Sequence, residues 1–127
     1  MICNDRYQQI ENNMNHHLDL AQELSLKTLE GYTFFKYMDI VRFEAEGNYT
    51  LVYVLQQDKP QKVFHTFLEV EEKVFGIGLF YKCHRSHIIN IHHLIHFCTK
   101  KNLLVTAKGE VPISDTFVKD FKERYCT

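Results

Sequence analysis

The chain has 127 residues, of which 45% are hydrophobic and 24% charged, and this composition is typical of a soluble globular protein with one core. Its formal net charge is −1, no apolar run is long enough to cross a membrane, and the N-terminus lacks the pattern of a signal peptide, so a cytoplasmic protein is expected. The four cysteines form no C-x-x-C pair, and their spacing suggests neither a zinc clip nor a disulfide framework.

Residues 1–24 are predicted to form a leader that precedes the domain at 25–127. Apolar side chains of the leader recur at steps of three and four, as on one face of a helix: Tyr7, Ile10, Met14, Leu18 and Ala21. Such a face would pack on the domain or on a second copy, and it is our candidate for dimerisation. A frayed polar segment is an equally supported interpretation, because the asparagines around Met14 weaken a helix.

From residue 25 the apolar period changes to two, which indicates β-strands. Gly47 and Asn48 both tolerate positive φ and are predicted to form a hairpin turn. On the strand before this turn, Arg42 and Glu44 fall on the polar face. The strands predicted in this half are residues 24–29, 32–36, 39–46, 49–55 and 62–65.

Two short helices are predicted further along. Thr66 and Glu69 form a capping box at the start of the first, whose inward side chains are expected to be Phe67, Val70 and Val74. Ser114 is expected to cap the second helix, after a hairpin around residues 100–102 and a short strand at 111–113. Phe117, Val118, Phe121 and Tyr125 share one face of this helix. The pattern predicts a mostly β fold of antiparallel strands with two helices.

Residues 82–90 form the most polar connection between two apolar runs. Arg85 lies among His84, Ser86 and His87, and strands on both sides are expected to hold it rigidly. A fixed guanidinium is able to donate two hydrogen bonds to a guanine edge or a phosphate. Asn90 lies between two isoleucines and is predicted to be a buried amide that satisfies turn backbone.

The charges of the chain are unevenly distributed. Residues 73–109 contain no Asp or Glu but have six basic side chains, namely Lys73, Lys82, Arg85, Lys100, Lys101 and Lys108. We interpret this acid-free stretch as the footprint of a polyanion. The alternative is β-structure that carries a few solvated lysines.

A metal site and an active site both have little support. His92 and His96 have a spacing that would suit zinc on a helix, but their neighbours favour a strand or turn and no third ligand is apparent. Cys83 and His84 point to opposite faces of an extended strand, so they cannot form a nucleophile–base pair. No metal, no cofactor and no enzymatic activity are expected.

Three stretches of the chain resemble the LytTR DNA-binding domain of bacterial transcription regulators. They are EGNYT at 46–50, HRSHIIN at 84–90 and VPIS at 111–114 before a helix. The resemblance implies antiparallel strands in small stacked sheets, which bind double-stranded promoter DNA through loops, usually as a homodimer. It also implies the output domain of a response regulator. The chain has no room for a receiver domain, so control would come from a regulatory protein partner, dimerisation or expression level.

The resemblance also implies which residues contact DNA. Arg85 and the turn at 47–50 would enter the grooves, and lysines would hold phosphates. Asp115 stands where many family members have a basic residue, which puts the contact at the last helix in doubt. A protein-interaction module that kept the fold and lost DNA binding is the alternative function. The implied DNA contacts are Asn48, Tyr49, Thr50, Lys82, His84, Arg85, Ser86, His87, Lys100, Lys101, Ser114, Thr116 and Lys119.

Overall fold

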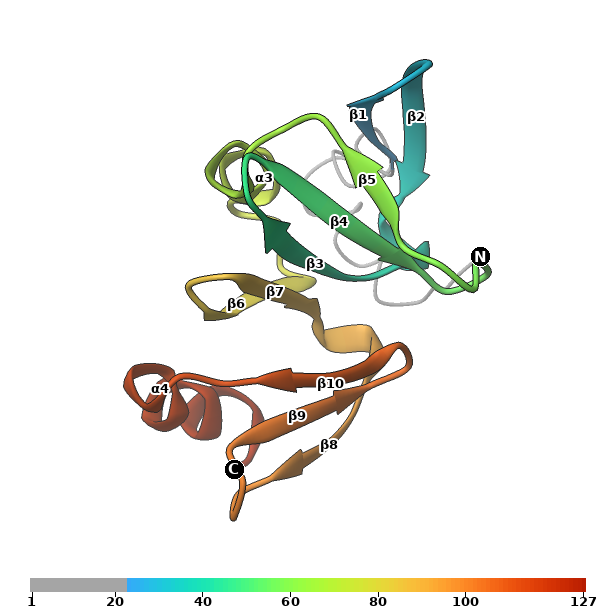
Figure 1. The fold of residues 1–127 in the computed structure, drawn as a ribbon. Coiled ribbons are helices and arrows are strands. Elements are labelled where there is room, and N and C mark those ends of the chain that lie inside the picture. The colour runs from blue at the N-terminus through green and yellow to red at the C-terminus, as the bar shows by residue number, and fades with distance from the viewer. Residues whose placement is uncertain (1–22) are drawn as a thin grey trace, which may run out of the picture.

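Strands dominate the fold of the chain (Figure 1). The computed structural model describes residues 23–127; nearly all of the predicted leader, with its apolar helix face, lies outside them and stays a prediction. The elements are β1 (Glu23–Thr28), β2 (Gly31–Lys36), the 3-10 turn η1 (Tyr37–Asp39), β3 (Ile40–Glu46), β4 (Tyr49–Val54), β5 (Gln61–Val63), α3 (Phe67–Val74), β6 (Phe80–His84), β7 (His87–Asn90), the 3-10 turn η2 (Ile91–His93), β8 (Leu94–Cys98), β9 (Leu103–Thr106), β10 (Gly109–Pro112) and α4 (Asp115–Tyr125).

The first half of the fold is a five-stranded antiparallel sheet in the order β5-β4-β3-β7-β6, with the β1–β2 hairpin beside β5. Helix α3 covers one face of this sheet and buries Phe67, Val70 and Val74, as predicted. The capping box at its start is confirmed, because Thr66 Oγ1 accepts a hydrogen bond from the Glu69 amide while Glu69 Oε1 accepts one from the Thr66 amide.

The second half is a three-stranded antiparallel sheet, in the order β10-β9-β8, with α4 packed on it. Phe121 of α4 is buried, whereas Tyr125 at the end of its apolar face remains partly exposed. Tyr81 on β6 anchors the helix, since its hydroxyl donates to Asp120 Oδ2 at 2.8 Å and its ring contacts Phe121. Ser114 occupies the N-cap position as predicted, but its side chain makes no capping hydrogen bond.

Strand β7 joins the two halves. Ile88 is buried in the core beneath α3, and the next residue, Ile89, is buried in the core beneath α4. Successive side chains of a strand point to opposite faces, so this four-residue strand supplies both cores. Asn90 at its end is fully buried; its amide donates to the carbonyls of Tyr37 and Ile40, and its Oδ1 accepts from the His92 amide. The prediction for Asn90 is therefore confirmed.

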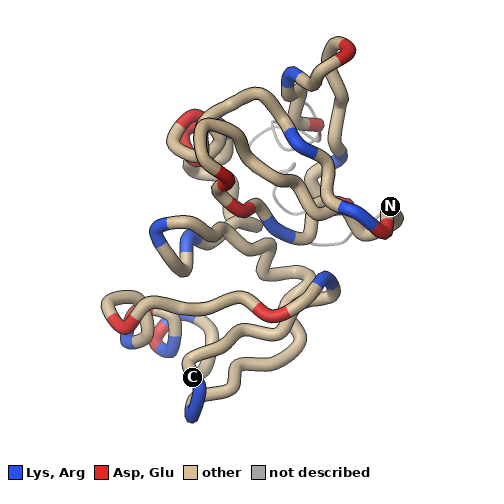
Figure 2. The backbone as a smooth tube through the Cα atoms, viewed as in Figure 1, with Lys and Arg blue, Asp and Glu red and all other residues tan. Residues whose placement is uncertain are grey.

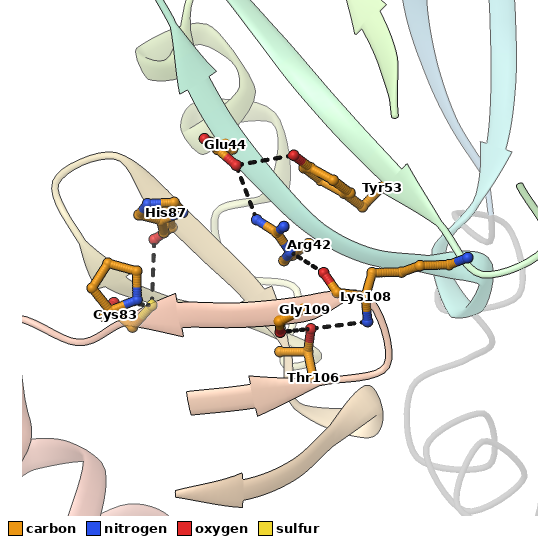
Figure 3. A network of polar contacts seen from close by, with 9 residues as sticks. Arg42, Glu44, Tyr53, Cys83, His87, Thr106, Lys108 and Gly109 are labelled. Carbon is orange, nitrogen blue, oxygen red and sulfur yellow. Dashed lines mark hydrogen bonds and ion pairs between the residues drawn. The ribbon is translucent and has the colours of Figure 1, made fainter. Parts of the chain in front are cut away.

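Arg42 makes a second connection between the halves (Figure 3). Its Nε donates to the Lys108 carbonyl in the β9–β10 turn at 2.8 Å, and its Nη1 donates to Glu44 at 3.1 Å. The guanidinium also lies 3.6 Å from the centroid of the Tyr53 ring, whose hydroxyl donates to the same Glu44 oxygen. The β9–β10 turn covers Arg42 to 7% exposure. Arg42 therefore lies inside the fold, although its strand face is polar.

The structure confirms the predicted fold class of small antiparallel sheets with two helices. His92 lies in η2 and His96 in β8, so they do not share a helix face. Among residues 23–127 no three His, Cys, Asp or Glu side chains are grouped to hold a metal ion. No helix in this part of the chain is long and apolar enough to span a membrane.

Candidate nucleic-acid interface

The turn between β3 and β4 presents the first group of implied contacts. Gly47 has φ +61°, which allows the tight reversal, and Asn48 is exposed at the tip. Tyr49 is also exposed, at 39%. Thr50 is fully buried, and its hydroxyl donates to the His65 carbonyl at 3.0 Å. The inclusion of Thr50 among the DNA contacts is therefore corrected: it holds the base of the hairpin and does not reach the surface.

The turn between β6 and β7 presents Arg85. Its side chain is exposed and forms no ion pair within residues 23–127. The turn itself is held by its neighbours, because the Ser86 amide donates to His84 Nδ1 at 3.1 Å. Cys83, just before the turn, is buried and directs its thiol at the carbonyls of His87 and Pro112. A rigid turn with a free guanidinium is the arrangement that the sequence predicted.

His87 lies at the inner end of this turn rather than at its tip. Its ring is 5.2 Å from the His84 ring, and its Nδ1 atom is buried with no hydrogen-bond partner among the described residues. Burial lowers the pKa of His87 below its ordinary value, an effect that Glu44 opposes and His84 reinforces. The neutral ring packs partly inside the fold, so His87 is poorly placed to add positive charge to the surface.

The start of α4 and the β8–β9 turn lie against each other. Asn102 in this turn has φ +52°, and its side-chain amide donates to Asp115 Oδ1 at 2.8 Å. The Ile113 amide donates to the Asn102 carbonyl. Asp115 therefore fixes the turn that carries Lys100 and Lys101, which are exposed, and Thr116 and Lys119 are exposed on α4. Ser114 is half-buried.

Backbone hydrogen bonds connect these segments into one continuous edge. The Ala45 amide, near the β3–β4 turn, donates to the Ser86 carbonyl at 2.9 Å. The Ser114 amide, before α4, donates to the Cys83 carbonyl at 2.9 Å. Figure 2 shows Lys and Arg along this edge, at the β6–β7 turn, on α4 and at the β8–β9 turn. The structure thus brings together segments that are up to about 70 positions apart in the sequence.

Not every basic residue of the acid-free stretch belongs to this edge, and the interpretation of that stretch as a single footprint is corrected. Lys82 Nζ makes an ion pair with Glu71 of α3 at 3.0 Å. Lys108 lies in the β9–β10 turn and donates to the Gln57 carbonyl, away from the β6–β7 turn (Figure 1). Lys73 is part of α3. Arg85, Lys100 and Lys101 remain from the stretch, and Lys119 joins them from α4.

Sequence reasoning missed two residues that position this edge. Arg42 holds the β9–β10 turn against β3, and Asp120 binds Tyr81 and so fixes α4 on β6. Burial and the Asp120 carboxylate both raise the pKa of Tyr81, which keeps its hydroxyl a donor. The sequence signal for Arg42 was a basic residue between two apolar strand residues, Val41 and Phe43. Nothing local in the sequence points to Asp120, because its partner is 39 positions away.

Comparison with known proteins identifies the family. A family model described as the LytTr DNA-binding domain matches residues 30–125. Among solved structures, the chain is similar to the LytTr DNA-binding domain of a Bacillus cereus protein described as a methyl-accepting/DNA response regulator. The two share 24% sequence identity and a TM-score of 0.66 over 80% of this chain and 94% of that chain, which shows a common fold. No curated protein matched the chain. Since the family model covers most of its length, the chain belongs to the LytTR family of DNA-binding domains.

Proposed function

We propose that this chain is the sequence-specific, duplex-binding module of a cytoplasmic bacterial transcription regulator, and that it binds DNA along the edge described above. The observation that carries the proposal is the set of hydrogen bonds Ala45–Ser86, Ser114–Cys83 and Asn102–Asp115. These bonds hold three turns and a helix start in fixed relation, with exposed polar or basic side chains on each. A rigid, multi-segment surface of this kind suits a duplex, whose phosphates and base edges are themselves regularly spaced.

The proposed roles follow from exposure and charge. Arg85 is an exposed turn side chain with a forked pair of donors, and Asn48 is an exposed turn side chain whose amide offers one donor group and one acceptor, so both are assigned to base edges in the grooves. Lys100, Lys101 and Lys119 are exposed and are assigned to phosphates. Lys82 is left out, because Glu71 already neutralises it. His84 is assigned to holding the turn, through its bond from the Ser86 amide.

Selection of bound duplexes from a random-sequence pool at low salt tests the proposal. We expect enrichment of a defined sequence, and an affinity for it that falls steeply with salt, because each neutralised phosphate releases counterions. Three phosphate contacts predict a slope of about −3 in a plot of log K against log salt. A folded protein that enriches no sequence and shows no salt-sensitive DNA affinity would instead support a protein-interaction module on the same fold.

A further inference from the structure

An exposed aromatic and basic cluster adjoins the β3–β4 turn on its far side from Arg85. Tyr49 and Phe64 have ring centroids 5.1 Å apart, and Lys62 on β5 places its Nζ 5.0 Å from the centroid of the Tyr49 ring. Lys62 is exposed, and within residues 23–127 no carboxylate is in ion-pair contact with it. None of the implied family contacts includes Lys62 or Phe64. Lys62 and Phe64 therefore have no role yet.

Its position relative to Arg85 follows from the register of the strands. Ser86 bonds to Ala45, Ala45 pairs with Thr50, and Thr50 pairs with Val63. These residues form one row across the end of the sheet. Neighbouring strands lie about 4.8 Å apart, so the row is roughly 15 Å long. Arg85 adjoins one end of the row and Lys62 adjoins the other. Asn48 is in the β3–β4 turn, which joins the two middle strands of the row.

This length fits the proposed partner. One turn of duplex DNA is about 34 Å long, so both ends of the row would lie within half a turn of a duplex that contacts the β3–β4 turn. The Tyr49 ring restricts where the Lys62 ammonium is held, because a cation is attracted to a ring face. A lysine on an edge strand also has a structural explanation, since it discourages pairing with other chains. The edge-strand explanation would hold for a lysine without an aromatic partner and without DNA, so it does not account for the contact between Lys62 and the Tyr49 ring.

We propose that Lys62 is an additional phosphate contact, positioned by Tyr49, which extends the DNA interface across the edge strand β5. The inference rests on the proposed function, and it adds a basic residue outside the matching family motifs. Tyr49 then acts by orienting Lys62 rather than by reading a base. Phe64 packs against the Tyr49 ring and completes the cluster.

The test compares Lys62→Gln with Lys59→Gln on the duplex that the wild-type protein selects. Both changes remove one positive charge from the β4–β5 region, but Lys59 lies in the turn at the end of β5 remote from the row. We expect the ratio of the wild-type DNA affinity to the Lys62→Gln affinity to fall about three- to fourfold between about 50 and 200 mM salt, because the variant has lost one phosphate contact. Lys59→Gln should show no such change, and Lys62→Arg should bind as the wild type does.

A double-mutant cycle tests the role of Tyr49. In a Tyr49→Leu background the effect of Lys62→Gln should be clearly smaller than in the wild type, because the ammonium is no longer held. Additive effects would overturn positioning by Tyr49, and identical salt dependence of Lys62→Gln and Lys59→Gln would overturn the contact. A wild-type protein that selects no duplex would overturn the proposed function itself. Far-UV circular dichroism of each variant verifies that it is folded.

Discussion

Arg85 is the single side chain whose removal should affect recognition most. It is exposed at the tip of the β6–β7 turn, and the Ser86–His84 bond holds the backbone beneath it. We predict that Arg85→Ala weakens binding to the selected duplex by about 1–3 kcal/mol and relaxes the base preference at one position. Repeating the selection with the variant measures both effects.

Arg124→Ala is the matched control for this prediction, because it removes the same charge from a side chain that Asp120 already pairs. It should leave the selected sequence unchanged. An equal loss of affinity in the two variants would mean that Arg85 contributes only net charge. A uniform loss on all duplexes would mean that Arg85 holds a phosphate instead of a base.

His87 gives the fold a dependence on pH at the scale of one side chain. Burial lowers its pKa in the folded chain, so below the ordinary value of 6.5 the unfolded chain binds the proton more readily. The stability that the neutral ring contributes is therefore complete above about pH 6.5 and is lost as the pH falls through the lowered pKa. Between about pH 7.5 and about pH 5.5, the free energy of unfolding measured in urea should fall more for the wild type than for His87→Gln, whose side chain cannot titrate. Equal losses would contradict this.

Two neighbouring residues of one motif differ in exposure, because side chains alternate along a strand. Tyr49 and Thr50 were both expected to contact DNA, yet adjacent strand residues point to opposite faces. Once Tyr49 is on the outer face, Thr50 must be inside, and its hydroxyl bonds to His65. Asn90 was predicted correctly, because its apolar neighbours already indicated burial. The strand period was therefore more informative than the motif for deciding which side chains are accessible.

At the scale of elements, the β8–β9 turn depends on an asparagine in the left-handed region. Asn102 has φ +52°, a conformation that glycine adopts freely and alanine adopts at a cost of about 1–2 kcal/mol. Both Asn102→Gly and Asn102→Ala lose the bond to Asp115. We predict that the alanine variant is the less stable by about 1 kcal/mol in urea unfolding. Equal stabilities would show that the turn adopts another conformation.

Elements specified by local chemistry were predictable, and their pairing was not. The hairpin at β1–β2, the capping box of α3 and the strands on both sides of Gly47–Asn48 follow from patterns within about ten residues. The insertion of β7 beside β3 does not, since it pairs Glu44 with His87 across 43 positions. The bond that Asp115 makes was likewise not predictable from its motif position alone. Its carboxylate is a repulsive charge in isolation but a hydrogen-bond acceptor for Asn102 in the fold.

At the scale of the whole molecule, Arg42 secures the contact between the two halves. Arg42→Met would leave the Lys108 carbonyl without its side-chain donor and would leave Glu44 with the Tyr53 hydroxyl but without its cationic partner. We predict a loss of about 2–3 kcal/mol in the free energy of unfolding, since charged hydrogen bonds in partly buried sites are involved. Urea unfolding measures it. Arg124→Met breaks an exposed pair and serves as the control; a loss as large as that of Arg42→Met would contradict the assignment.

The distribution of charge also becomes clear only for the whole molecule. The sequence suggested one basic footprint in residues 73–109, but folding pairs Lys82 with Glu71 and turns Lys108 toward Gln57. In exchange it joins the start of α4, the helix that carries Lys119, to β6 through the Ser114–Cys83 bond and to the β8–β9 turn through Asn102 and Asp115. Contiguity along a chain is a poor guide to contiguity on a surface when strands reverse every few residues.

The shared use of β7 by both cores limits how the β6–β7 turn is able to evolve. Ile88 and Ile89 fill different cores, so deleting or inserting one residue after Arg85 would exchange the two side chains and disrupt both halves at once. Substitution at the tip carries no such penalty. Under the proposed function, the chemistry of the tip, and hence the target, is therefore free to change while the number of residues in the turn stays constant.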